Sequence, residues 1–105
     1  MIEKQLQLYE ELLNKKEFYK AHEALEVVWF EKRFEENNEI KLLKGFINAA
    51  VCFELIKRGK NKQSKIPWKN YLKYRTLLYK IDSPNLNRYH KTARHIEILK
   101  NTQNI

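Results

Sequence analysis

The chain has 105 residues, of which 43% are hydrophobic and 32% charged, and its formal net charge at pH 7 is +8. This length fits one domain, residues 1–105, with a modest core that needs neither a disulfide nor a metal ion to fold. Two glycines and two prolines are too few for a turn-rich β architecture or a low-complexity disordered chain, so the composition predicts an all-α protein.

Apolar residues at helical spacing predict the first two helices. Near the start of the chain, apolar residues recur every three or four positions, and this first series predicts a helix from about Ile2 to Asn14. A short connection over residues 15–17 leads to a second helix over residues 18–33. The first series consists of Ile2, Leu6, Tyr9 and Leu13. The core face of the second helix is expected to carry Phe18, Ala21, Leu25, Val28 and Trp29.

The third helix is expected over residues 39–58. It is apolar around much of its circumference, which predicts that it lies at the centre of a bundle. Asn37 or Asn38 can accept hydrogen bonds from the free amides at its start. Gly45 weakens a helix by about 1 kcal/mol relative to alanine, and a close approach of another helix would compensate for this cost. Gly59 follows two cationic residues, as a C-terminal cap should.

The C-terminal part is predicted to contain a loop and two further helices. Residues 59–66, GKNKQSKI, form the loop, and Pro67 lies in the first turn of the fourth helix. The boundary at residues 82–84 precedes a fifth helix, and the chain is expected to fray from Asn101 onward. The inward face of the fourth helix is expected to carry Trp68, Tyr71, Leu72, Arg75, Leu78 and Tyr79. The result is a five-helix bundle with short connections.

The sequence contains no sign of export or of membrane insertion. No stretch approaches the roughly 20 apolar residues of a transmembrane helix, and the first helix is amphipathic rather than built like a signal peptide. The single cysteine, Cys52, lies in the apolar run AAVCF and is expected to be a small buried hydrophobic residue. We therefore expect a cytoplasmic protein with no membrane partner.

A polar cluster interrupts the apolar pattern of the second helix in the segment FYKAHEALEVVW. His22 and Glu26 are four residues apart, so their side chains lie one above the other at the edge of the buried face. Glu23 is rotated by about 100° from His22 and shares the flank of Glu26. Polar residues of the third helix are expected near the same region. The candidate site residues are His22, Glu23, Glu26, Trp29, Asn48 and Glu54.

Three interpretations of this cluster stay open. A histidine one turn from a carboxylate can ligate a divalent metal or move a proton. HEALE is not the zinc motif HExxH, however, because Glu26 stands where the second histidine would be. The same groups could form a satisfied hydrogen-bond network that selects one packing arrangement. They could also line a ligand pocket or a subunit interface. No cofactor is predicted beyond a divalent metal ion that His22 and Glu26 could hold.

The chain resembles the family known only as domain of unknown function 309. Its pattern is close to Y-E-A-H-E-x-L-E-x-x-W, then G-L-I-Q-x-A, then R-G-N. The matching residues are Tyr19, Ala21, His22, Glu23, Leu25, Glu26, Trp29, Gly45, Ile47, Ala49 or Ala50, Arg58 and Gly59. Asn48, Glu54 and Lys60 depart from the pattern. The resemblance covers roughly residues 10–62 and implies a small helical bundle with a polar site around His22 and Glu26. It implies no established activity.

Charge is distributed unevenly between the two halves of the chain. Residues 1–56 contain eight basic and eleven acidic residues, a net charge of −3, whereas residues 57–105 contain thirteen basic and two acidic residues, a net charge of +11. This asymmetry points to an anionic partner. Trp68, Tyr71 and Tyr74 lie among the cations and could stack on bases, although their spacing also suits a core. The candidate nucleic-acid contacts are Lys57, Arg58, Lys60, Lys62, Lys65, Lys69, Lys73 and Arg75.

Three functions follow from these patterns. The first is a helical domain that binds a ligand, an ion, a partner protein or a second copy of itself at the polar cluster. The second is nucleic-acid binding through the basic residues between positions 57 and 100. The third is a metal-dependent hydrolase with Glu23 or Glu26 as general base. No nucleophile, phosphate loop or oxyanion donor can be recognised in the sequence, which favours binding over catalysis.

Overall fold

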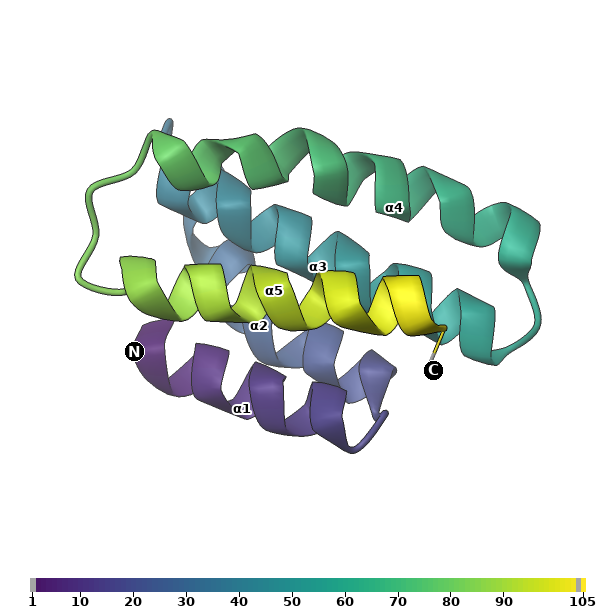
Figure 1. Cartoon of the computed structure of the whole chain (residues 1–105). Helices are drawn as coiled ribbons and strands as arrows, with labels where there is room; N and C mark the ends of the chain where they lie inside the picture. Colours follow the sequence, from purple (N-terminus) through teal and green to yellow (C-terminus); the bar gives the residue numbers. More distant parts are fainter. Residues whose placement is uncertain (1, 104) are drawn as a thin grey trace.

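The computed structural model describes residues 2–103 and 105, and all regular structure among them is helical (Figure 1). The helices within this part of the chain are α1 (Ile2–Asn14), α2 (Phe18–Lys32), α3 (Asn38–Lys57), α4 (Asn61–Arg75), the 3₁₀ helix η1 (Thr76–Tyr79) and α5 (Leu86–Thr102). The prediction of an all-α bundle of about five helices is confirmed, and the bounds of the first three helices agree with prediction to within one residue.

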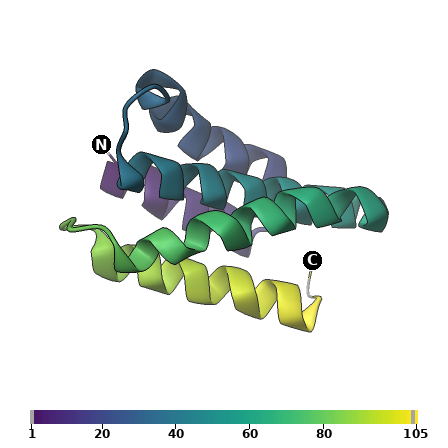
Figure 2. The same cartoon turned by 90° about the horizontal axis from the view of Figure 1, so that it is seen from above.

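Helix α3 lies at the centre of the bundle. It packs between α2 and α4, while α5 lies across it on the side opposite α2 and reaches α1 (Figures 1 and 2). The ring of Phe46 on α3 contacts the rings of Tyr9, Tyr71 and Tyr89, at centroid distances of 6.2, 6.2 and 5.9 Å. These three tyrosines come from α1, α4 and α5. One aromatic cluster therefore joins the helices around α3, as its apolar circumference predicts.

Two glycines fulfil the roles predicted for them. A Cβ atom at Gly45 would lie 2.8 Å from the Cβ atom of Tyr74, so the missing side chain allows α3 and α4 to approach closely. Gly59 follows α3 with φ of 77°, the left-handed conformation of a C-terminal cap. At the other end of α3, Asn37 Oδ1 accepts a hydrogen bond of 2.8 Å from the amide of Glu39, which confirms the predicted cap.

The predicted loop over residues 59–66 is wrong. Helix α4 begins at Asn61, so Pro67 is buried inside the helix and not in its first turn. Lysine and glutamine have high helix propensity, so this segment forms a helix although it has no apolar repeat. In addition, Ser64 Oγ donates a hydrogen bond of 2.6 Å to the carbonyl of Asn61. Proline removes one hydrogen bond to the carbonyl four residues before it, and the packing of α4 against α3 outweighs this loss.

The remaining differences concern the ends of α4 and α5. The chain tightens into η1 after Arg75, and this change of helical period leaves Tyr79 exposed rather than inward; Leu72 is exposed as well. Helix α5 begins after Pro84 and continues to Thr102, beyond the point where fraying was predicted; residue 104 lies outside the described residues. Ser83 Oγ donates to Glu39 Oε2 at 2.8 Å, and Tyr89 donates to the same oxygen, which fixes the start of α5 against α3.

Burial of Cys52 matches its prediction. The side chain lies in the core, and burial raises the pKa of its thiol. Such a cysteine behaves as a small hydrophobic residue and not as a nucleophile. Among residues 2–103 and 105, no helix combines the length and the apolar character that a membrane span requires.

Candidate functional site

The polar cluster of α2 has the predicted geometry. His22 Nδ1 donates a hydrogen bond of 2.9 Å to the carbonyl of Tyr19, because a carbonyl can only accept. The other ring nitrogen, Nε2, lies 3.3 Å from Glu26 Oε2. The His22 side chain is 16% exposed and that of Glu26 is 47% exposed. The two side chains therefore lie at the rim of the buried face, with the histidine held in one orientation by its own helix.

His22 lines a small cavity between α2 and α3, which we call the α2 pocket. Its volume is about 200 Å³, and it is lined by Phe18, Tyr19, His22, Val51, Glu54, Leu55 and Arg58. Glu54 Oε2 accepts a hydrogen bond of 2.6 Å from Arg58 Nε. The pocket therefore combines an apolar wall with a histidine and an ion pair. Glu54 lies near His22, as the sequence predicts, and Arg58 joins them.

The other candidate residues of the cluster lie elsewhere. Asn48 faces α4: its Nδ2 donates to the carbonyl of Lys44 at 2.8 Å, and its Oδ1 accepts from Asn70 Nδ2 at 3.2 Å. Glu23 is exposed. Trp29 is partly buried against the core, with Lys44 Nζ 4.0 Å from its ring centroid. The expected approach of Asn48 to His22 is wrong, because Asn48 lies on the side of α3 that meets α4.

Metal ligation remains a hypothesis for His22 and Glu26. A structural or catalytic zinc site takes three or four protein ligands. Within residues 2–103 and 105, no group of three or more His, Cys, Asp or Glu side chains is arranged to hold a metal ion. The donors adjacent to each other are one imidazole and one carboxylate, which are too few for such a site.

Three of the predicted nucleic-acid contacts are occupied by interactions within the protein. Lys57 Nζ donates to the carbonyl of Lys16 at 2.9 Å, Arg58 pairs with Glu54, and Arg75 pairs with Glu97. The remaining five are exposed: Lys60, Lys62, Lys65, Lys69 and Lys73. Tyr71 is fully buried and is unavailable for stacking on a base, as its core spacing indicates.

The outer face of α2 and the turn that follows it carry exposed apolar residues that were not predicted as a group. We call this set the α2 stripe: Tyr19, Val27, Phe30 and Phe34, which are 54%, 61%, 56% and 85% exposed. The Arg33 guanidinium lies 3.7 Å from the ring centroid of Phe30 and 4.5 Å from that of Phe34. Tyr19, Val27 and Phe30 lie within about 80° of the helix circumference, with the exposed Glu23 between Tyr19 and Val27. Phe34 lies in the turn that follows the end of α2 at Lys32. The spacing of the first three residues, on the face opposite the core series, is the signal that could have revealed the stripe.

A second pair of ionisable groups joins α1 to α5. Glu10 Oε2 lies 2.9 Å from His95 Nδ1, and both side chains are largely buried. Burial alone would raise the pKa of Glu10, but the hydrogen bonds from His95 and Thr92, together with the charges of His95 and Lys91, outweigh it and the pKa is lowered. The two residues are 85 positions apart, so no sequence spacing could have indicated the pair.

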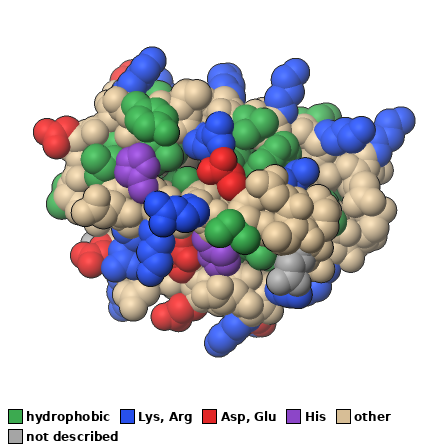
Figure 3. All heavy atoms as spheres, in the orientation of Figure 1, with side chains coloured by type: hydrophobic (Ala, Val, Ile, Leu, Met, Phe, Trp, Pro, Cys, Tyr) green, Lys and Arg blue, Asp and Glu red, His purple; other side chains and the backbone are tan. Residues whose placement is uncertain are grey.

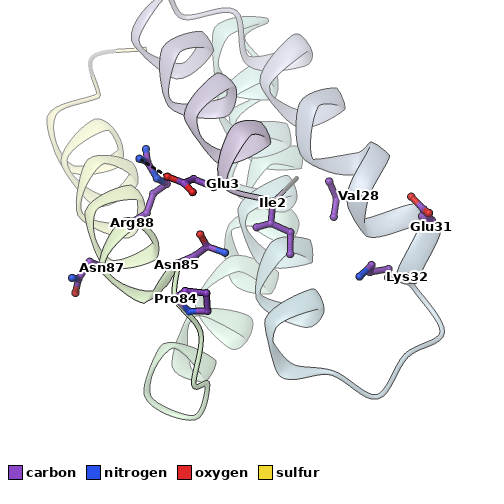
Figure 4. A pocket seen from close by; sticks show the side chains of 9 residues that line it. All are labelled: Ile2, Glu3, Val28, Glu31, Lys32, Pro84, Asn85, Asn87 and Arg88. Carbon is purple, nitrogen blue, oxygen red and sulfur yellow. Dashed lines mark ion pairs between the residues drawn. The ribbon is translucent and has the colours of Figure 1, made fainter.

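A hollow of about 600 Å³ lies where α1 and α5 begin and α2 ends (Figure 4). Ile2 lies between two groups of polar side chains. Arg88 and Glu3 form an ion pair of 3.7 Å on one side, and Glu31 and Lys32 lie on the other. Opposite charges on both sides leave this hollow without a preference for an anion or a cation.

Comparison with known proteins assigns the family. Neither a curated protein nor a solved structure matches the chain. The family model described as a domain of unknown function, DUF309, matches residues 6–66, which is more than half of the chain. The matched region contains the α2 pocket and the α2 stripe and ends inside α4. The chain therefore belongs to the family of domain of unknown function 309.

Proposed function

We propose that this protein is a protein-binding domain whose contact surface is the outer face of α2. The observation that carries the proposal is the α2 stripe beside the α2 pocket. Nine large hydrophobic side chains are exposed among the described residues; four form the α2 stripe, and the others are spread over α1, α4, η1 and α5. Scattered exposed apolar residues are ordinary, whereas a group of them on one face marks an interaction site. Within the stripe, Arg33 joins the rings of Phe30 and Phe34.

The residue types of the α2 stripe suit a binding surface. Aromatic and arginine side chains dominate the energetics of protein interfaces. Aromatic rings bury much area and order few rotatable bonds. Arg33 stacks on Phe30 and Phe34 and donates a hydrogen bond to the carbonyl of Phe30. A surface that is already ordered loses less conformational entropy when a partner binds.

The α2 pocket supplies the specific part of this surface. Small-molecule sites have volumes of about 300–1,000 Å³, so a cavity of about 200 Å³ suits a single side chain of a partner. Phe18 and Leu55 offer apolar contact, and Glu54 offers a carboxylate oxygen that Arg58 Nε leaves free. The polar cluster then has the role of orienting the side chain that enters.

Charge around the stripe points to the chemistry of the partner. Glu23, Glu26 and Glu31 lie on α2 around the stripe, and Glu35 and Glu36 follow it. Complementary charges at the edge of an interface speed association and exclude unsuitable partners. The expected partner therefore presents an apolar centre with lysine or arginine at its rim.

The proposal is tested with the double variant Phe30→Ser, Phe34→Ser. Both side chains are exposed, so the thermal midpoint is expected to stay within a few degrees of that of the unmodified protein. Proteins captured from the source cell by the unmodified protein, measured by quantitative mass spectrometry, should be lost with this variant. Sedimentation equilibrium examines self-association in parallel, and a dimer of the unmodified protein should dissociate in the variant.

The matched control is Leu8→Ser, Ile98→Ser, which removes two exposed apolar residues from α1 and α5. It should retain the captured proteins and any dimer. The proposal fails if the unmodified protein captures nothing above a bait-free control and is monomeric. It also fails if the control and the α2 variant lose the same proteins.

A further inference from the structure

Two hollows form a groove between α4 with η1 and helix α5, and α5 lies on the side of α3 opposite α2 (Figures 1 and 2). We call this groove the α4–α5 seam. One hollow of about 350 Å³ is lined by Ile56, Asn61, Ser64, Lys65, Trp68, Lys69, Leu72, Lys100 and Gln103. A second, of about 430 Å³, lies further along and includes Arg75, Tyr79, His90, Arg94 and Glu97. Lys100 and Asn101 are neighbours in the chain and line different hollows, so the two hollows follow one another along one seam.

The seam is strongly cationic. Residues 61–102 contain ten basic and two acidic residues. The first hollow is lined by three lysines and by no carboxylate among the described residues, and the carboxylate of the second, Glu97, is paired with Arg75. Lys and Arg side chains spread along the α4 edge of this face, with hydrophobic side chains between them and α5 (Figure 3). A concave surface that carries positive charge concentrates anions.

Aromatic rings lie in both hollows. Trp68 is partly buried: Phe53 and Tyr71 pack against it at 6.2 and 4.9 Å, and Lys100 Nζ lies 5.2 Å from its ring centroid. Tyr79 is 83% exposed and contacts the His90 ring at 6.0 Å. Seven residues of α-helix and four of 3₁₀ helix separate the two rings by about 18 Å along the seam.

We propose that the α4–α5 seam binds single-stranded nucleic acid. Phosphates would pair with Lys65, Lys69 and Lys100, and bases would stack on Trp68 and Tyr79. Cations that follow a groove, interleaved with aromatic rings, form the surface that holds unpaired strands without sequence preference. Both rings line the seam, and the exposed Tyr79 ring is open to stacking by an unpaired base. The site is separate from the surface in the proposed function, because α2 and α5 lie on opposite sides of α3.

The test is fluorescence anisotropy with labelled oligothymidylate of about twelve nucleotides, a length within the range of known single-strand sites. The full chain should bind it, with an affinity that falls steeply as salt rises. The variant Lys65→Gln, Lys69→Gln, Lys100→Gln should lower the slope of log affinity against log salt by about 2, since each phosphate contact contributes about 0.7. Its control, Lys4→Gln, Lys15→Gln, Lys20→Gln, has the same net charge and should keep the slope.

Variants of Tyr79 distinguish stacking of bases on its ring from the general attraction between a basic protein and an anion. Tyr79→Ala should weaken binding of the single strand by about fivefold or more, whereas Tyr79→Phe should restore it. Competition by a duplex of the same length and by polyglutamate should be weak. The proposal is overturned if oligothymidylate does not bind at low salt, or if the control lysine variant loses as much slope as the seam variant. Equal competition by the duplex or by polyglutamate overturns it as well.

Discussion

Two buried tyrosines with different surroundings illustrate how single residues stabilise this bundle. The hydroxyl of Tyr9 donates a hydrogen bond of 2.6 Å to the carbonyl of Phe46. The hydroxyl of Tyr71 has no hydrogen-bond partner among the described residues. Burial raises the pKa of both phenols, so both hydroxyls are neutral at physiological pH. Both rings contact Phe46, and removing either hydroxyl leaves these ring contacts in place.

The substitutions Tyr9→Phe and Tyr71→Phe should therefore have different effects. Tyr9→Phe removes a satisfied buried hydrogen bond and should lower the free energy of unfolding by about 1 kcal/mol. Tyr71→Phe removes a hydroxyl whose burial is uncompensated, so stability should stay unchanged or rise by up to about 1 kcal/mol. Urea denaturation of the two variants measures both effects. Equal losses for the two variants would show that Tyr71 has a partner of its own.

Among the elements, α5 is fastened to the bundle by polar contacts as well as by its apolar face. At its start, Glu39 of α3 accepts from Ser83 and Tyr89. Near its middle, Glu10 of α1 pairs with His95. The pKa of Glu10 lies below its ordinary value of 4.5, so the pair stabilises the fold while the carboxyl is ionised. This stabilisation is present above the unfolded-state pKa and is lost as pH falls through the lower pKa of the folded state.

Glu10→Gln should lower the free energy of unfolding by about 1–2 kcal/mol at pH 6, because the variant loses the charge that pairs with His95. The difference between variant and unmodified protein should shrink as pH falls below about 4.5. Denaturation curves at several pH values measure it. Glu11→Gln, an exposed neighbour, serves as the control and should show little difference at any pH. A difference for Glu10→Gln that stays constant down to pH 3 would contradict this account.

The sequence predicts four of the five α-helices closely because their apolar residues repeat at helical spacing. The start of α4 has no such repeat. Of its first six residues only Ser64 is buried, and Ile66 is exposed, so apolar periodicity cannot indicate a helix there. Pro67 adds a second misleading signal, since proline is frequent in the first helical turn. Helix formation in this segment depends on the helix propensity of its residues and on packing against α3. A periodic pattern of apolar residues shows neither.

The candidate site could be predicted in part for similar reasons. His22 and Glu26 lie four residues apart on one helix, so their approach follows from sequence alone. The rotation of α2 and α3 about their axes decides which side of α3 faces α2, and sequence spacing does not contain it. This rotation places Glu54 in the α2 pocket and Asn48 against α4. The exposure of Phe30 and Phe34 was not foreseen, because aromatic residues in a helix are more often buried.

At the scale of the whole molecule, the charge asymmetry of the chain becomes a difference between two faces. The acidic surface around α2 and the cationic α4–α5 seam lie on opposite sides of α3 (Figures 1 and 2). The electrostatic fields of the two faces act on different partners. At 0.1 M salt each field is screened over about 10 Å. The two proposed surfaces can therefore be occupied at the same time, and variants of one should leave the other intact.

The family match ends at residue 66, inside α4, so the matched region cannot bury its own core. Removing the rest of the chain deletes six buried apolar residues, Tyr71, Leu78, Tyr89, Ala93, Ile96 and Leu99. At roughly 1.5–3 kcal/mol for each large side chain, the loss is on the order of 10 kcal/mol. This is comparable to the entire stability of a typical domain.

A fragment of residues 1–66 should therefore fail to unfold cooperatively in urea, whereas the full chain should show one sharp transition. Circular dichroism should still detect helix in the fragment, and an apolar dye should bind the exposed surface of Phe46 and Phe53, as it binds loosely packed states. Mixing residues 1–60 with a separately made fragment of residues 61–105, which keeps α4 whole, should restore the transition. A sharp transition of the 1–66 fragment by itself, with a slope in proportion to its length, would show that α1, α2 and α3 form a sufficient core without α4 and α5.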